Sequence, residues 1–171
     1  MRKLAIVAFS FFLLVAGCQT TGILSDADKQ IKIATMYRQY ASEFPTVQGI
    51  TVAQLQQLQR QEKKVVLVDV RSPEEIAVSY IPEAITPKEF ESNLSKYQDA
   101  TVIAYCTIGY RSGLYAEKLQ QQGIEILNLE GSLLAWSHAG GKLTDGTKDT
   151  RKVHVFGRQW QLTSSSYESV W

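Results

Sequence analysis

The sequence predicts an α/β fold in which a mostly parallel sheet is covered by helices. Three short segments are predicted strands, at residues 65–70, 101–105 and 124–129. The segment at 101–105 lacks polar alternation, which is typical of a strand buried on both faces. Segments of helical periodicity separate them, and strands that alternate with helices form parallel sheets. The 171 residues suffice for one domain with a buried core, and the formal net charge of +1 gives no indication of nucleic-acid binding.

Residues 1–17 have the features of a secretory signal peptide. Arg2 and Lys3 precede an apolar run that is too short to span a bilayer comfortably. The run ends in Val-Ala-Gly-Cys18, which resembles the lipobox of bacterial lipoproteins. The resemblance implies cleavage before Cys18 and lipid attachment there, and Gln19 favours the periplasmic face of the outer membrane in the cell envelope. The alternative is an ordinary signal peptide with an incidental cysteine.

Residues 18–45 are expected to form a short polar tether and then a helix. Ser25 is a suitable cap for a helix over residues 25–43, with Asp26 and Asp28 in its first turn. We expect its apolar stripe to dock on the next domain rather than on a membrane, because the polar face is mixed and not basic. The stripe consists of Ile33, Tyr37, Tyr40 and Phe44.

The core domain is predicted at residues 46–142. A short strand at 46–50 leads to Thr51-x-x-Gln54, which matches a capping box. Two further helix starts, at residues 72–75 and 86–89, combine a cap with proline at the first helical position. The second of these helices is expected to bury Phe90, Leu94 and Tyr97, and a last helix is expected at residues 132–139.

The central feature is the segment that follows the strand at 101–105. Cys106 stands where this strand ends, Gly109 breaks the apolar pattern, and a helical pattern begins at Arg111 and stops at Gly123. Ligands of α/β folds bind at the carboxyl ends of the strands, which places Cys106 at a candidate site. The helical pattern rests on Leu114, Tyr115 and Leu119, which recur at helical spacing.

The loop after Cys106 is suited to a reactive thiolate. Amides of a tight turn form an anion-binding nest, the following helix adds the positive end of its dipole, and Arg111 adds a permanent charge. Each of these lowers a thiol pKa from its free value of about 8.5. The alternative is that Cys106 is a small hydrophobe of the core.

These residues resemble the rhodanese family. Cys106-Thr-Ile-Gly109-Tyr-Arg111 is similar to the family's active-site loop, Cys-x-x-Gly-x-Arg. Three more blocks follow the family's order, and together the four cover about residues 47–142; the other three are residues 69–75, 81–85 and 129–136. The chain departs from the family at Tyr80, where histidine is frequent, and at Glu83 and Ser132, where glycine is frequent.

The resemblance implies a single rhodanese-like domain that acts as a sulfurtransferase without a cofactor or a metal. A Cys106 persulfide would carry a sulfane sulfur from a thiosulfate-like or persulfide donor to a thiol or cyanide. Arg111 would grip an anionic donor or lock the loop through Asp69 or Glu130, and Asp69 and Arg71 would support the loop. The remaining loop residues, Thr107, Ile108, Gly109, Tyr110 and Ser112, would bind or line the entrance. With one cation in the loop, thiosulfate is expected to be a poor natural donor.

Three other functions compete with this interpretation. A rhodanese-like module can bind or sense sulfur with little turnover. A phosphatase or arsenate reductase is disfavoured because its related loop is Cys-x5-Arg, whereas four residues separate Cys106 from Arg111. The third alternative is a structural envelope lipoprotein in which Cys106 is incidental. If Cys18 carries lipid, no internal disulfide and no resolving cysteine remain, and the isolated His138 and His154 do not match a zinc site.

Residues 143–171 are predicted to form a C-terminal extension with a β-hairpin. Alternation around Val153 and Val155 predicts one strand, residues 157–158 a turn, and residues 160–162 the return strand. Aromatic residues suggest that the extension packs down; they are Trp160, Tyr167 and Trp171. A strap over the domain is favoured over a lid or a partner surface near the site, and no protein partner is identified.

Overall fold

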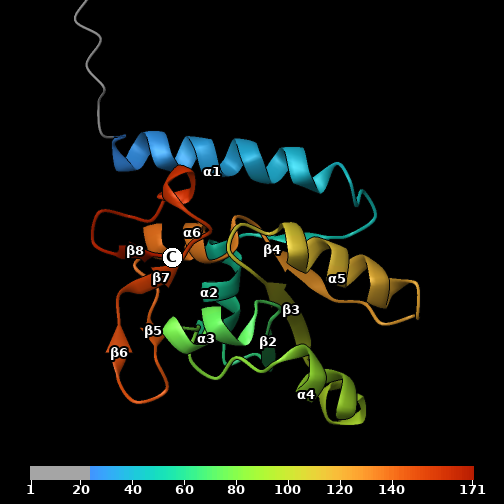
Figure 1. Cartoon of the computed structure of the whole chain (residues 1–171). Helices are drawn as coiled ribbons and strands as arrows, with labels where there is room; N and C mark the ends of the chain where they lie inside the picture. Colours follow the sequence, from blue (N-terminus) through green and yellow to red (C-terminus); the bar gives the residue numbers. More distant parts are fainter. Residues whose placement is uncertain (1–23) are drawn as a thin grey trace, which may run out of the picture.

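The computed structural model describes residues 24–171 (Figure 1). The predicted signal peptide at 1–17, the predicted lipidation site Cys18 and residues 19–23 lie outside the described residues. Among the described helices, none is long and apolar enough to cross a membrane.

A four-stranded parallel sheet forms the centre of the fold. Its strands are β1 (Gly49–Ile50), β2 (Val65–Asp69), β3 (Thr101–Tyr105) and β4 (Leu127–Leu129), in the order β1-β4-β3-β2. β2 and β3 pair along their whole length, from Val65 opposite Thr101 to Asp69 opposite Tyr105. Their carboxyl ends therefore lie at the same edge of the sheet. The predicted α/β fold with a mostly parallel sheet is confirmed.

Strand β3 is buried on both faces and divides the core in two. Ile103 and Tyr105 join the larger cluster with α2 (Val52–Arg60) and α6 (Ser132–His138). Val102 and Ala104 join the smaller cluster under α4 (Pro87–Ser92), the 3₁₀ turn η1 (Leu94–Tyr97) and α5 (Tyr110–Gln120). Successive strand residues face opposite sides, which explains why this segment lacks polar alternation.

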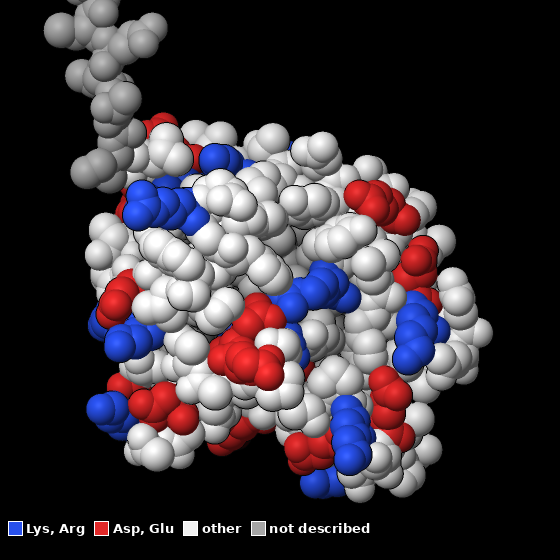
Figure 2. All heavy atoms as spheres, viewed as in Figure 1, with Lys and Arg blue, Asp and Glu red and all other residues white. Residues whose placement is uncertain are grey.

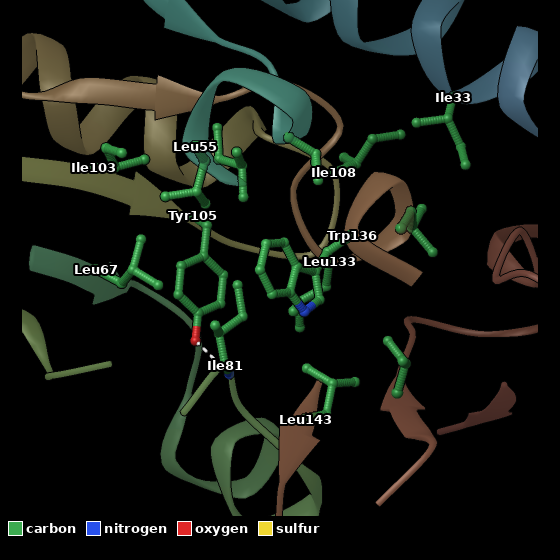
Figure 3. Packing of buried hydrophobic residues seen from close by; sticks show 14 of the residues in the cluster. Ile33, Leu55, Leu67, Ile81, Ile103, Tyr105, Ile108, Leu133, Trp136 and Leu143 are labelled. Carbon is green, nitrogen blue, oxygen red and sulfur yellow. Dashed lines mark hydrogen bonds between the residues drawn. The ribbon is translucent and has the colours of Figure 1, made fainter. Parts of the chain in front are cut away.

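Tyr105 anchors the larger cluster next to the site. Its ring lies between Leu67, Ile81 and Trp136, and the Ile81 N–H donates to its hydroxyl oxygen at 3.1 Å (Figure 3). The side chain is fully buried, and burial raises its pKa well above the ordinary value. Because a buried polar atom without a partner is costly, the Ile81 hydrogen bond makes this site suitable for tyrosine.

Most helices begin at the predicted caps. Complete capping boxes form at Ser25 for α1 (Asp26–Ala41), at Thr51 for α2, and at Ser72 for α3 (Pro73–Val78). The Thr86 side chain caps α4 by accepting from the Glu89 N–H at 3.2 Å. Each cap satisfies amides that the first helical turn leaves without a backbone partner.

Two leucines of the predicted helical patterns, Leu94 and Leu114, are exposed. Leu94 is exposed because α4 ends at Ser92, and the following 3₁₀ turn does not continue the α-helical period. Leu114 is exposed because α5 begins at Tyr110 and buries a face formed by smaller residues and Leu119. The predicted common face of Phe90, Leu94 and Tyr97 therefore fails at Leu94, because the α-helix stops before it.

Helix α1 lies along one side of the domain (Figure 1). It docks there through the expected apolar stripe. Ile33, Tyr37 and Phe44 are buried, and Tyr40 is half-buried against the larger cluster. Gly113 in α5 packs directly against the Phe44 ring, and a Cβ there would collide with the ring. Glycine therefore allows this close approach of α5 to the segment after α1.

The C-terminal extension contains no hairpin at residues 153–162, which corrects the prediction. A hairpin forms earlier, between β5 (Leu143–Thr144) and β6 (Asp149–Thr150). β7 (Lys152–His154) instead pairs in parallel with β8 (Glu168–Val170). Between them, the 3₁₀ turn η2 (Arg158–Trp160) occupies part of the predicted return strand and turns the chain away from β7.

The extension is strapped to the domain at both α6 and α1. The Leu162 carbonyl lies 2.9 Å from His138 Nε2, and the Tyr167 hydroxyl donates to the Gly141 carbonyl at 2.6 Å. The Ser165 N–H donates to the Asp26 carboxylate at 3.0 Å, so the extension also meets the first turn of α1. These bonds agree with the predicted strap.

Candidate active site

Cys106 lies at the carboxyl edge of the sheet, directly after β3. Its side chain is 1% exposed and forms part of the wall of a cavity of about 550 Å³. The cavity is lined by Tyr40, Glu43, Cys106, Thr107, Ile108, Tyr110, Arg111, Phe156 and Trp160. Five of the predicted site residues therefore meet at one cavity.

The start of α6 fixes the main chain of Cys106. The Cys106 N–H donates to Ser132 Oγ at 3.1 Å, and the Leu133 N–H donates to the Cys106 carbonyl at 3.2 Å. The Leu134 N–H donates to the Thr107 carbonyl at 3.1 Å. Amides that α6 would leave unpaired at its N-terminus thus hold the reactive loop. Ser132 has a φ of +45°, in the region that glycine favours, and its hydroxyl supplies a bond that glycine lacks.

The loop turns at Gly109, whose φ is +105°. A Cβ at this position would lie 2.7 Å from the Tyr37 ring, so the turn requires glycine for both conformation and space. The Gly109 N–H donates to Cys106 Sγ at 3.1 Å. The first α5 bond runs from Gly113 N–H to the Gly109 carbonyl at 3.2 Å, so the amides of residues 110–112 precede it. This is the arrangement of an anion-binding helix N-terminus beside the sulfur.

Ser112 stabilises this loop through a hydrogen bond to Asn128. Its buried hydroxyl donates to Asn128 Oδ1 at 2.7 Å, and Asn128 Nδ2 donates to the Gly109 carbonyl at 2.9 Å. The Ser112 side chain is not part of the cavity wall, although its amide belongs to the loop. Asn128, the middle residue of β4, was not predicted, and its buried side chain holds the turn at Gly109.

Arg111 is held by Glu75, and neither Asp69 nor Glu130 is its partner. Two guanidinium nitrogens donate to the Glu75 carboxylate at 2.7 and 2.8 Å, which is a bidentate pair. Burial opposes ionisation of Glu75, but the Arg111 bonds, the Ser72 N–H and the charges of Arg111 and Arg71 outweigh it and lower its pKa to about 2. The predicted lock on the loop is therefore present with a different carboxylate.

Asp69 and Arg71 form a buried pair behind the loop. Arg71 donates to the two Asp69 carboxylate oxygens at 2.9 and 2.6 Å and to the Ser79 carbonyl at 2.6 Å. Burial lowers the pKa of Arg71, but the hydrogen bonds and charge of Asp69 outweigh it, so the pKa is raised. Neither side chain lines the cavity, and the pair connects β2 to the end of α3.

Comparison with known proteins decides the family. The family described as "Rhodanese-like domain" matches residues 51–139, more than half of the chain. The chain belongs to the rhodanese-like domain family. Cys106, Gly109 and Arg111 all lie inside the matched range.

Several relatives of this rhodanese-like chain carry sulfurtransferase names. An uncharacterized protein, slr1261, from Synechocystis is 40% identical over 101 residues, or 56% of this chain and 56% of that protein. A sulfurtransferase from Allochromatium vinosum is 40% identical over 82 residues, or 44% of this chain and 75% of that protein. The structure of a thiosulfate sulfurtransferase from Pseudomonas aeruginosa has 20% identity and a TM-score of 0.55, covering 68% of this chain and 23% of that one, which supports the fold. The chain thus spans about half the length of the Synechocystis relative.

Residues outside the rhodanese-like match complete the site. Phe156 and Trp160 come from the C-terminal extension, and Tyr40 and Glu43 come from α1 and the segment after it. The Arg111 guanidinium lies 4.7 Å from the centre of the Phe156 ring. Neither aromatic was predicted at the site, because the extension carries no motif that places it there.

Two further groups complete the surroundings of Glu75. His154 Nδ1, from β7, lies 3.9 Å from Glu75 Oε1, and Thr107 Oγ1 lies 3.5 Å from the same oxygen. Within residues 24–171, no group of three His, Cys, Asp or Glu side chains is placed to hold a metal ion. The site itself offers a thiol beside the amide of Gly109 and a guanidinium held by Glu75.

Proposed function

We propose that the protein is a sulfurtransferase that carries a sulfane sulfur as a persulfide on Cys106. The observation that carries the proposal is the Gly109 N–H at 3.1 Å from Cys106 Sγ, at the open N-terminus of α5. Amides in this position stabilise negative charge on the sulfur and on a sulfur added to it. The family match and the relatives named sulfurtransferases support a sulfur-transfer role.

The reaction has two halves. The Cys106 thiolate attacks the outer sulfur of a thiosulfate-like or persulfide donor, and a bond forms between the two sulfurs. The rest of the donor, which is sulfite in the case of thiosulfate, leaves with the electrons of the broken S–S bond. Cyanide or a thiolate then attacks the outer sulfur of the persulfide, and Cys106 leaves as a thiolate. No net oxidation of the protein occurs, so no further redox partner is required.

Arg111 acts mainly as a positioning residue in this proposal. Glu75 occupies the ends of its guanidinium, so the charge stabilises the loop and contributes to the potential at Cys106. A phosphatase would instead use the arginine to bind phosphate oxygens directly. The four residues between Cys106 and Arg111, one fewer than in the related phosphatase loop, disfavour the phosphatase or arsenate reductase alternative.

Thiocyanate formation from thiosulfate and cyanide tests the proposal. We expect ping-pong kinetics, loss of activity in Cys106→Ser, and a lower rate in Arg111→Lys, which keeps the charge but loses the bidentate pair. A Cys106→Ser variant with full activity would overturn the site assignment. Binding of sulfur without turnover by the unaltered protein would instead favour a binding or sensing module.

We also propose that lipid on Cys18 anchors the protein to the periplasmic face of the outer membrane. The proposal rests on the lipobox-like sequence before Cys18. On the face drawn in Figure 2, acidic and basic side chains are interspersed, so charge alone offers little attraction to a membrane. Mass spectrometry of the N-terminal peptide from membranes should find acylated Cys18; an unmodified Cys18 in a soluble protein would contradict the anchor.

A further inference from the structure

The outer wall of the Cys106 cavity is aromatic. Tyr40 and Tyr110 form one pair with ring centres 5.0 Å apart, and Phe156 and Trp160 form another with ring centres 5.9 Å apart. Ile108 adds a further apolar surface at the same cavity. Pockets with aromatic walls and few polar groups bind apolar bodies of small molecules.

The charges at this cavity disfavour an anion. Of its nine lining residues, only Glu43 and Arg111 are charged. Arg111 is paired with Glu75 and lies against the Phe156 ring, although its side chain stays 31% exposed. Glu43 forms no salt bridge with any residue of 24–171. The Tyr110 hydroxyl donates to Glu43 at 3.3 Å, and the Glu43 charge raises the Tyr110 pKa. An anion would therefore meet an uncompensated carboxylate at the entrance.

The cavity is also larger than an inorganic sulfur anion requires. Its volume is about 550 Å³, within the range of small-molecule sites, whereas thiosulfate has only five non-hydrogen atoms. The remaining space adjoins the aromatic wall. A substrate that fills it would carry an apolar body beside its sulfur.

We propose that the natural sulfur acceptor is an uncharged thiol with an apolar, aromatic-sized body. Tyr40, Tyr110, Phe156 and Trp160 bind that body, and Glu43 discriminates against anionic thiols. The inference rests on the proposed function and names its substrate class. The acceptor thiol loses its proton to solvent and attacks the outer sulfur of the Cys106 persulfide. A new S–S bond forms as the bond to Cys106 Sγ breaks, and the products are an acceptor persulfide and the Cys106 thiolate.

Alkylation of Cys106 tests the pocket without requiring turnover. The full chain is treated separately with iodoacetamide, N-benzyliodoacetamide and iodoacetate, and adducts are assigned to Cys106 by peptide mass mapping. Each rate is divided by the rate of the same reagent with free cysteine, which removes intrinsic reactivity. We expect N-benzyliodoacetamide to exceed iodoacetamide by about 10- to 100-fold, the factor for burying a phenyl ring. We expect iodoacetate to be the slowest.

Variants separate the aromatic wall from the charge. The benzyl preference is the normalised rate with N-benzyliodoacetamide divided by the normalised rate with iodoacetamide. Trp160→Ala should reduce this preference about threefold or more, and Trp160→Phe should keep most of it. Glu43→Gln should raise the relative iodoacetate rate by about two- to fivefold at low salt. Trp171→Ala is the matched control, because Trp171 is an exposed aromatic of the same extension that does not line the cavity.

Two results would overturn the proposal. One is a benzyl preference in the unaltered protein equal to that of free cysteine, and the other is an undiminished preference in Trp160→Ala. A parallel assay with a persulfide-loaded chain compares benzyl mercaptan with glutathione as acceptors. If alkylation shows the preference but no donor yields a persulfide, the pocket is as proposed and the sulfurtransferase function fails. If a persulfide forms and both alkylation and acceptor use lack the preference, only this inference fails.

Discussion

Replacement of Glu75 by glutamine removes the charge that faces Arg111 while keeping the size of the side chain. The Glu75 side chain is 5% exposed, and in the folded protein its pKa falls from 4.5 to about 2. A pKa change of one unit corresponds to about 1.4 kcal/mol, so ionised Glu75 contributes on the order of 3 kcal/mol to the free energy of unfolding at neutral pH. Arg111 is 31% exposed, and water screens part of the pair. We therefore expect Glu75→Gln to lower the free energy of unfolding by about 2–3 kcal/mol at pH 7.

The stabilising contribution of Glu75 should decrease as the pH falls. Because the folded pKa of Glu75 lies below the unfolded value, its contribution is complete above about pH 5 and is lost as the pH falls from 4.5 towards 2. Urea unfolding at pH 7 and at pH 2.5 should show a gap between the unaltered protein and Glu75→Gln that narrows at low pH. Glu74→Gln, at the exposed neighbouring position, is the control and should show a much smaller gap. A Glu75→Gln gap that is absent at pH 7, or equally large at both pH values, would refute this account of the Arg111 lock.

Three further substitutions test separate parts of the site's support. Gly109→Ala should lower the free energy of unfolding by about 2 kcal/mol or more, because φ is +105° and the new Cβ would meet Tyr37. Urea unfolding should show this loss of stability, and the Cys106-dependent activity should also fall. Asp69→Asn should cost about 3–5 kcal/mol by leaving buried Arg71 without a charged partner, and a change under 1 kcal/mol would contradict that role. Glu83→Gly should raise the free energy of unfolding by about 1 kcal/mol, since Glu83 has a φ of +65°; a loss of stability would show that its side chain matters more than its backbone.

Local features of the fold could be predicted from the sequence because their causes are local. The capping boxes at Ser25, Thr51 and Ser72 depend on residues three positions apart. Strand β3 has the predicted bounds, because a short β-branched run between turn-forming residues leaves few alternatives. The place of Cys106 at the end of this strand followed directly.

The partner of Arg111 could not be predicted because it depends on tertiary packing. Glu75 stands 36 residues earlier, and its capping box with Ser72 already explained its presence. Only the packing of α3 beside the Cys106 loop shows that one carboxylate serves both the cap and the arginine.

The C-terminal extension was predicted least well, for a physical reason. Its strands have only two or three residues each, and parallel pairing of β7 with β8 brings together residues that are distant in sequence. Alternation around Val153 and Val155 indicated a strand but carried no information about its partner. The placement of Phe156 and Trp160 at the cavity follows from this pairing and from the turn η2.

The most direct test of the central claim is the mass of the intact protein after incubation with a sulfur donor. Thiosulfate and inorganic polysulfide should be used separately, each with and without a dithiothreitol wash, and the modified peptide should be mapped. We predict a gain of one sulfur atom on the peptide that contains Cys106, reversed by dithiothreitol and absent in Cys106→Ser. No gain with either donor, while Cys106 still reacts with an alkylating reagent, would contradict the persulfide mechanism.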